Sequence, residues 1–379
     1  MREPMRRWLN LRPGSPWVVL ATGLAMVLSV SLLTAIRAPS RPPQASAAPP
    51  TEPSTPSALP SPSSSAQIAA HGGLQIVRTT GANGWVVLPD GSGIWVAGAG
   101  TLTRIDPRTG ATRVTAHGPW DYDFVRLAEY GEGTIYVTYG TNLVAMDPGS
   151  GTVITTMDLS SLGYVDSVLS DPSSLWVAAS GEDGSQVLAE VDPDTGKVMR
   201  RVHRIGQGLH VLVRAGGYLF VSSNGGAATL LRVDPRTLAT TRVRGIPPGT
   251  SIAGVGSHLW MTGSEGVRCL DAFTLESCGE VDIRGFIRLA ADGRDLWVLS
   301  APLKGEAYIP GVGRRSTVTL VNGGNANVLA GPLPIPGNHP SSVAAFQGRA
   351  WVGYYRTGNV TEIARCAPGT CRGPQDHAS

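Results

Sequence analysis

Residues 175–198 read LWVAASGEDGSQVLAEVDPDTGKV and contain the pattern that decides the fold. The bulky apolar run 175–177 (LWV) is followed by a Gly-containing turn, a second apolar run and the tight turn 192–196 (DPDTG). Short apolar runs separated by Gly, Asp and Pro are typical of β-strands joined by hairpins. In the tight turn, Asp accepts backbone N–H groups, Pro sets φ at about −65° and Gly takes the left-handed conformation. This stretch therefore predicts three consecutive strands of an antiparallel sheet.

The apolar run with its central aromatic residue recurs seven times along the chain. The seven aromatic residues are Trp95, Tyr136, Trp176, Phe220, Trp260, Trp297 and Trp351. Their successive spacings, 37 to 54 residues, average about 43, which is the period of a four-stranded propeller blade. A further short strand precedes each aromatic strand, so each unit holds four strands. The sequence predicts an all-β fold, a seven-bladed β-propeller of four-stranded blades.

The two ends of the repeat complement each other. The seventh unit runs to residues 360–363 (VTEI) and has no fourth strand after it. A strand without a partner of its own, residues 74–79 (LQIVRT), precedes the first unit. We expect this N-terminal strand to supply the outer strand of the seventh blade, because pairing the two ends removes a lone sheet edge.

Over residues 74–371 these units resemble the YVTN, NHL and virginiamycin B lyase-like group of seven-bladed propellers, through the LWVAAS…VLAEVDPDTGKV pattern. The resemblance implies the fold and leaves lyases, receptor heads and interaction platforms open, because propellers host unrelated functions. Lyases of this group use His with Glu and a divalent cation, and no complete motif of theirs matches this chain. Residues 192–197 also resemble a quinoprotein repeat, but residues 199–200 (MR) stand where that repeat has its closing Trp. No quinone, and no other cofactor, is expected.

An uncharged apolar run of twenty residues lies at 17–36. At ~1.5 Å per residue it is long enough to cross a ~30 Å hydrocarbon core as a transmembrane helix. Four Arg and one Glu precede the run and two Arg follow it, so the positive-inside rule favours a signal anchor with residues 1–16 in the cytoplasm. A cleaved signal peptide is the alternative, since residues 45–47 (ASA) form an A-x-A site, but that site lies nine residues beyond the run. Either interpretation predicts an exported body.

Composition divides the rest of the chain. Residues 37–66 are rich in Pro, Ser and Ala and have no apolar period, which predicts a disordered linker. The propeller is expected over residues 67–371, with a C-terminal tail at 372–379. Beyond residue 66 there are 25 basic and 26 acidic side chains. This near-neutral balance lacks the excess of positive charge typical of nucleic-acid-binding proteins. We expect a single-pass cell-membrane protein with an extracellular propeller.

The four cysteines form two local pairs. They are Cys269 with Cys278 and Cys366 with Cys371. Aligning Asp271 with Asp106 places the first pair on the third and fourth strands of one hairpin, where cross-strand partners come within bridging distance. In an exported protein two disulfides are expected. A zinc site is the alternative, but the two pairs lie in different blades and no matching His spacing accompanies them.

The recurring aromatic residues have two interpretations. An exposed ladder of Trp could stack on carbohydrate, whereas one aromatic residue per blade on a buried second strand fills the space between blades. We expect the second arrangement.

Charged residues gather at one end of the predicted ring. With the first strand of each blade innermost, the Asp-Pro turns lie on one rim, and the second-to-third and fourth-to-first connections lie on the other. An insertion at 301–315 lengthens a connection of the sixth blade on that second rim. The candidate binding residues on this rim are Asp121, Asp123, Asp166, His210, Arg288 and His339. Variable loops on a rigid ring are where binding usually occurs.

The predicted function is therefore an anchored platform that binds an unknown protein or small-molecule ligand in the cell envelope. A metal-dependent lyase with His210 or His339 as general base is one alternative. A structural exported head without a ligand is the other. No Ser/His/Asp order, P-loop, GxSxG or HExxH signature is present, so no catalytic residue and no metal ligand are assigned.

Overall fold

The computed structural model describes residues 73–366, with gaps at 83, 85, 91, 99–100, 117–127, 132, 182–183, 185, 226–228, 248–249, 264–265, 303–314 and 338. No helix in this described part is long and apolar enough to cross a membrane. The apolar run at 17–36, the predicted linker at 37–66 and the tail at 372–379 lie outside the described residues.

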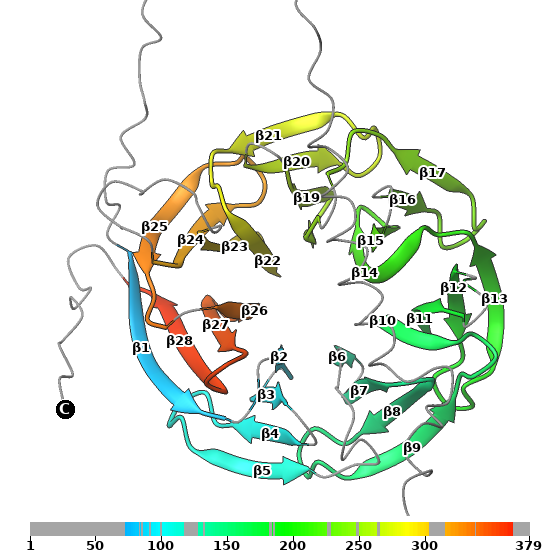
Figure 1. The fold of residues 1–379 in the computed structure, drawn as a ribbon, viewed down its shortest axis with the longest axis horizontal. Coiled ribbons are helices and arrows are strands. Elements are labelled where there is room, and N and C mark those ends of the chain that lie inside the picture. The colour runs from blue at the N-terminus through cyan, green and yellow to red at the C-terminus, as the bar shows by residue number, and fades with distance from the viewer. Residues whose placement is uncertain are drawn as a thin grey trace, which may run out of the picture. The chain divides into compact units, whose positions relative to one another are not determined.

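The described residues form seven four-stranded antiparallel sheets arranged in a ring (Figure 1). The innermost strands are β2 (Val86–Pro89), β6 (Ala128–Gly131), β10 (Tyr164–Asp171), β14 (Gln207–Ala215), β18 (Ile252–Val255), β22 (Phe286–Asp292) and β26 (Pro340–Phe346). The second strands are β3 (Ile94–Ala97), β7 (Thr134–Tyr139), β11 (Ser174–Ser180), β15 (Tyr218–Gly225), β19 (His258–Thr262), β23 (Asp295–Ala301) and β27 (Arg349–Tyr354). The third strands are β4 (Leu102–Ile105), β8 (Asn142–Met146), β12 (Gln186–Val191), β16 (Thr229–Val233), β20 (Val267–Asp271), β24 (Thr317–Asn322) and β28 (Asn359–Arg365). The outer strands are β5 (Thr112–Ala116), β9 (Val153–Asp158), β13 (Val198–His203), β17 (Thr240–Val243), β21 (Ser277–Val281), β25 (Val328–Pro334) and β1 (Leu74–Gly81).

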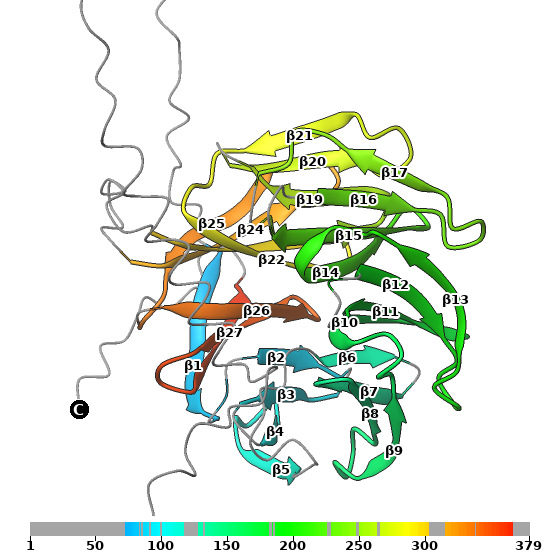
Figure 2. The same cartoon turned by 45° about the vertical axis from the view of Figure 1, so that its right-hand side comes forward.

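The ring closes through its two ends. Strand β1 pairs antiparallel with β28, from Leu74 opposite Arg365 to Gly81 opposite Asn359. In the turned view of Figure 2, β1 still lies with the C-terminal strands β26 and β27. The predicted seven-bladed fold and its closure by the N-terminal strand are confirmed, and the strand extends two residues beyond the predicted Thr79.

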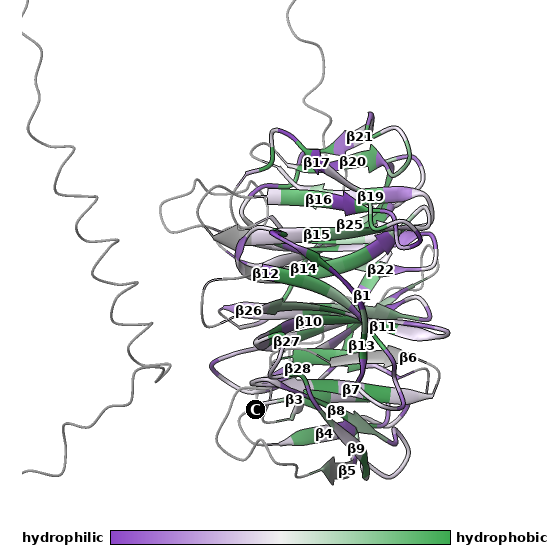
Figure 3. Ribbon diagram, turned by 90° about the vertical axis from the view of Figure 1, so that its right-hand side faces the viewer, coloured by the Kyte–Doolittle hydropathy of each residue, from purple (hydrophilic) through white to green (hydrophobic). Residues whose placement is uncertain are grey.

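Connections alternate between two rims because neighbouring strands in each blade are antiparallel. We call the rim with the first-to-second and third-to-fourth connections the turn rim. The axial rim carries the second-to-third connections and the segments that lead into the innermost strands. Seen from the side, hydrophobic residues follow the strands and hydrophilic residues follow the loops at both rims (Figure 3).

Each junction between neighbouring blades holds one apolar cluster in the described residues. Every cluster contains the repeated aromatic residue of one blade together with apolar residues of the next blade. Trp176 of β11, for example, packs with Leu212 of β14 and Leu219 of β15. Trp260 also donates its Nε1–H to the carbonyl of Gly323 in the following blade at 2.8 Å. The five Trp of the repeat are at most 3% exposed, so they fill the junctions, as expected, and present no face to a sugar.

The Asp turns have the predicted geometry. Asp192 Oδ1 accepts the N–H groups of Asp194 at 3.0 Å and Thr195 at 2.8 Å. Asp106, Asp147, Asp234 and Asp271 cap their turns in the same way, and Asn322 does so in the sixth blade. The hydroxyl and N–H of Thr195 hold the pKa of Asp192 below its usual value. These carboxylates are engaged by their own turns.

Candidate functional site

The axial rim contains the candidate binding residues that the structure describes. Asp166 lies in β10, His210 in β14 and Arg288 in β22, and His339 directly precedes β26. Asp121 and Asp123 lie outside the described residues, and for His210 only the strand position is described. All four placed residues are therefore near the start of an innermost strand, as the repeat predicted.

These four positions fall into two groups on opposite sides of the axis. Strands β10 and β14 are neighbours, since the Leu212 N–H donates to Ser167 Oγ at 3.3 Å. This contact brings the backbone at Asp166 and His210 close together. Strands β22 and β26 lie side by side across the central opening from β10 and β14 (Figure 1). Arg288 and His339 thus belong to the second group.

Asp166 is held within its own blade. Its side chain is buried, and Ser180 Oγ on the neighbouring strand β11 donates to its Oδ2 at 2.5 Å. Ser180 Oγ also lies 2.9 Å from Gln186 Oε1 on β12. This buried carboxylate thus has a hydrogen-bond donor within its own sheet.

Arg288 is a partly buried cation close to the ring axis. Burial lowers the pKa of its guanidinium from the usual value. Its Nη1 donates to the carbonyl of Ile287 at 3.5 Å, and the next residue, Leu289, donates its N–H at 3.3 Å to the Oγ of Ser251, which directly precedes β18. The strand that carries the arginine is therefore fastened to the neighbouring blade.

His339 is exposed and has a φ of 65°. A left-handed backbone is uncommon for a residue with a side chain, although His tolerates it better than most. The residue after it, Pro340, starts β26 and has its own φ fixed by its ring. An exposed imidazole thus stands on a constrained backbone at the start of an innermost strand.

The second-to-third connections of the sixth and seventh blades also belong to the axial rim. The long segment between β23 and β24 is the second-to-third connection of the sixth blade, where the insertion was expected, and its residues 303–314 lie outside the described residues. In the seventh blade, the same connection exposes Tyr355, which is 54% accessible. Its neighbour Tyr354 is buried, and burial raises the pKa of the Tyr354 hydroxyl to about 12.

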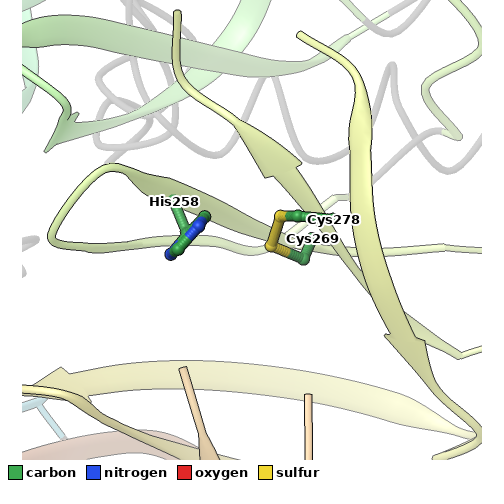
Figure 4. Close-up of side chains that lie close together, drawn as sticks. All are labelled: His258, Cys269 and Cys278. Carbon is green, nitrogen blue, oxygen red and sulfur yellow. A yellow bond between two sulfur atoms is a disulfide. The ribbon is translucent and has the colours of Figure 1, made fainter. Parts of the chain in front are cut away.

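A second cluster lies in the fifth blade, at the turn-rim end of its sheet. Cys269 of β20 and Cys278 of β21 form a disulfide, as expected, and His258 of β19 is directed toward them (Figure 4). The ligand atoms of these three residues all lie within 4.8 Å of one another. Cys366 is also disulfide-bonded, and its predicted partner Cys371 lies outside the described residues.

The sequence did not predict His258 as part of a site, because its spacing from Cys269 and Cys278 matches no zinc motif. The signal was in the strand register. Trp260 pairs with Cys269 across β19 and β20, so His258, two residues earlier on the same face, pairs with Asp271.

Comparisons with known proteins identify an architecture. No family model matches the chain, and no curated protein matches it. Among solved structures, a chain of the mitotic checkpoint complex has a TM-score of 0.58 and 12% sequence identity, covering 85% of this chain and 99% of its own length. The chain is a seven-bladed β-propeller.

A second solved propeller is BamB from Moraxella catarrhalis, with a TM-score of 0.48 and 18% identity, covering 76% of this chain and 85% of BamB. In all, 1146 chains of solved structures match. A likeness shared so widely, at such low identity, shows the fold alone.

Proposed function

We propose that this chain is a membrane-anchored extracytoplasmic propeller that uses its axial rim to bind a protein or small-molecule ligand. Support for the anchor comes from the uncharged run at 17–36 with its excess of preceding Arg, and the linker at 37–66 would then separate the propeller from the membrane. The propeller supplies a rigid ring, and rigid scaffolds that carry variable loops commonly bind through those loops.

One observation carries the proposal for the axial rim. On the turn rim the repeated carboxylates are used to cap their own turns, whereas on the axial rim charged residues come from different blades at the starts of innermost strands. The side chains of Arg288 and His339 lie there on fastened or constrained backbone. Such placement of charge around an axis favours recognition of a polar partner.

The anchor is tested by protease protection. Protease added to intact cells is expected to remove the propeller, while a tag fused before Met1 stays protected. A propeller that survives in intact cells and is digested only after lysis would contradict the proposed topology.

The axial rim is tested with a matched pair of double variants of the head, residues 67–379, on a solid support. One carries Arg288→Gln and His339→Ala, and the control carries Arg242→Gln and His203→Ala on exposed outer strands. Envelope extract is passed over wild type and both variants, and bound species are quantified by mass spectrometry. We expect at least one species to fall about tenfold on the axial variant, the effect of losing one binding hot spot, and to be retained by the control. Identical binding by all three heads would contradict the proposed rim.

The same variants distinguish the lyase alternative. A candidate substrate is incubated with each head in the presence and absence of a divalent cation. Turnover that requires the cation and is lost in the axial variant would show that the protein is an enzyme and not a binding platform. Thermal melting of each variant verifies that the ring is intact.

A further inference from the structure

The cluster in the fifth blade brings three metal-binding side chains together on three neighbouring strands. His258 comes from β19, Cys269 from β20 and Cys278 from β21, and their ligand atoms lie within 4.8 Å of one another. Two thiolates and one imidazole, with water in the fourth position, are a known ligand set for zinc. In the structure the sulfurs are joined to each other, so neither is available as a thiolate.

The two cysteines lie on paired strands, with Cys269 opposite Gly279 and Cys278 at the bulge beside it. On one side of the pair, Val267 lies opposite Val281 and Arg268 opposite Glu280. On the other side, the Asp271 turn closes the hairpin, with Asp271 N–H donating to the carbonyl of Glu276 at 2.9 Å. Breaking the disulfide therefore leaves two thiols on adjacent paired strands, which is the preorganisation that a metal site needs.

His258 is fixed by pairing on both sides. Its partners are Val255 on β18 and Asp271 on β20. Asp271, the partner of His258 on β20, is itself held by its turn, because its Oδ1 accepts the N–H groups of Phe273 at 2.9 Å and Thr274 at 2.8 Å.

Equivalent positions in other blades show that joining the third and fourth strands does not require cysteine. The residue paired with the repeated Trp is Glu190 in the third blade and Glu362 in the seventh. Each of these glutamates forms an ion pair with an arginine of the outer strand, Arg200 and Arg78 respectively. Cys269 occupies the same position in the fifth blade, opposite Trp260. A disulfide thus stands where two other blades use an ion pair.

We propose that reduction of the Cys269–Cys278 disulfide converts this cluster into a zinc-binding site with His258 as the third protein ligand. The inference is independent of the axial rim and of its function. Disulfide and metal exclude each other, because the same two sulfurs serve both. The blade therefore has an oxidised, metal-free state and a reduced, metal-bound state.

A protein or small-molecule dithiol supplies the two electrons. One of its thiolates attacks the sulfur of Cys278, the less buried of the pair, and Cys269 leaves as a thiolate. The second thiol of the reductant then attacks the mixed disulfide and releases Cys278, so the dithiol becomes a disulfide and the protein gains two protons. Zinc binding displaces these two protons from the thiols.

The test uses the head, residues 67–379, in a Cys366→Ser/Cys371→Ser background, so that the pair in the fifth blade is the only source of thiols. Protein is titrated with Co²⁺ before and after reduction by a phosphine, and Zn²⁺ is then added as competitor. We expect the reduced protein alone to develop the thiolate-to-metal absorption of a tetrahedral site, with one ion per chain, and Zn²⁺ to abolish it.

His258→Ala is expected to weaken binding by about tenfold or more, in keeping with loss of one ligand. His203→Ala, an exposed histidine on the third blade, is the matched control and should bind like the parent. Equal Co²⁺ binding by oxidised protein, or unchanged affinity in His258→Ala, would overturn the proposal. Circular dichroism follows the fold throughout, and a head that unfolds on reduction and binds no metal would also overturn it.

Discussion

The two rims of the propeller use the same kinds of charged residue in opposite ways. On the turn rim, Asp side chains cap their own turns, and arginines reach across to the following blade. Arg200 donates to the carbonyls of Pro235 and Arg236 at 2.9 and 2.8 Å, and Arg78 donates to those of Pro107 and Arg108 at 3.1 and 3.0 Å. On the axial rim, Arg288 and His339 follow no repeated pattern. The repeated charged residues of the turn rim stabilise the ring, whereas Arg288 and His339 belong to no repeat.

The difference shows how a repeat protein separates stability from recognition. Residues that recur in each blade are engaged with backbone groups of their own or the next turn, so changing them should cost stability. Residues that occur in one blade only should cost little stability when changed. The following predictions test this division, from the largest expected effect to the smallest.

Removal of the closing strand is the most severe change. A head that begins at residue 82 lacks β1, which leaves β28 without its outer partner and removes the Arg78 contacts to the first blade. We expect loss of cooperative unfolding in thermal and urea melts, far beyond the effect of trimming an ordinary terminus. A head that begins at residue 73 is the control. If both heads melt alike, closure does not hold the ring.

Asp90→Ala probes a buried acceptor on the turn rim. Asp90 Oδ2 accepts from Trp95 Nε1 and from Arg104 Nε, both at 2.9 Å. Burial alone would raise its pKa, but Arg104 and the N–H groups of Ser92 and Gly93 lower it overall. Removing the carboxylate leaves a mostly buried guanidinium unpaired, and the free energy of unfolding should fall by about 3–5 kcal/mol.

Asp194→Ala is the control for this change, since its side chain is exposed on a turn, and it should alter stability by less than about 0.5 kcal/mol. Equal effects in denaturant unfolding of the two variants would break the argument that the Asp90 network stabilises the ring.

His339→Gly should increase the stability of the fold, whereas Asp90→Ala should decrease it. Glycine adopts a φ of 65° without steric cost, so the substitution relieves strain while increasing the entropy of the unfolded chain. We expect stability to rise by up to about 1 kcal/mol, measured as the midpoint of urea unfolding. A loss above 1 kcal/mol would mean that the histidine serves the fold, and the contrast between the rims would weaken.

The acid dependence of the turns is the smallest effect. The pKa of the Asp192 carboxyl is lower in the folded protein than its unfolded value of about 3.8. The ionised carboxylate therefore stabilises the fold at any pH above that unfolded pKa, and this stabilisation is lost as the pH falls through the folded pKa. Asp192→Asn keeps the acceptor oxygen, as Asn322 does naturally, and removes the titration.

We therefore expect melting temperature to fall less steeply below pH 4 in Asp192→Asn than in wild type. Asp194→Asn, on the same turn, should follow the wild-type curve. A variant curve parallel to that of the wild type would show that the turn carboxylates do not contribute to acid unfolding.

Local patterns were sufficient to predict the blades. The period of the aromatic residues, the Asp-Pro turns and the unpaired strand near Leu74 depend on contacts within one hairpin or on the repeat itself, and the structure confirms them. The Cys269–Cys278 disulfide was predictable for the same reason, because both residues belong to one hairpin.

The sequence by itself determined the number of blades, their turn chemistry and which residues are buried between them, because these follow from short-range periodicity and backbone preference. Only the tertiary structure decided which residues of different strands meet. It placed His258 beside the two sulfurs and the Asp166 and Arg288 positions on opposite sides of the axis. Such meetings depend on strand register and on closure of the whole ring, and no local sequence pattern encodes either in full.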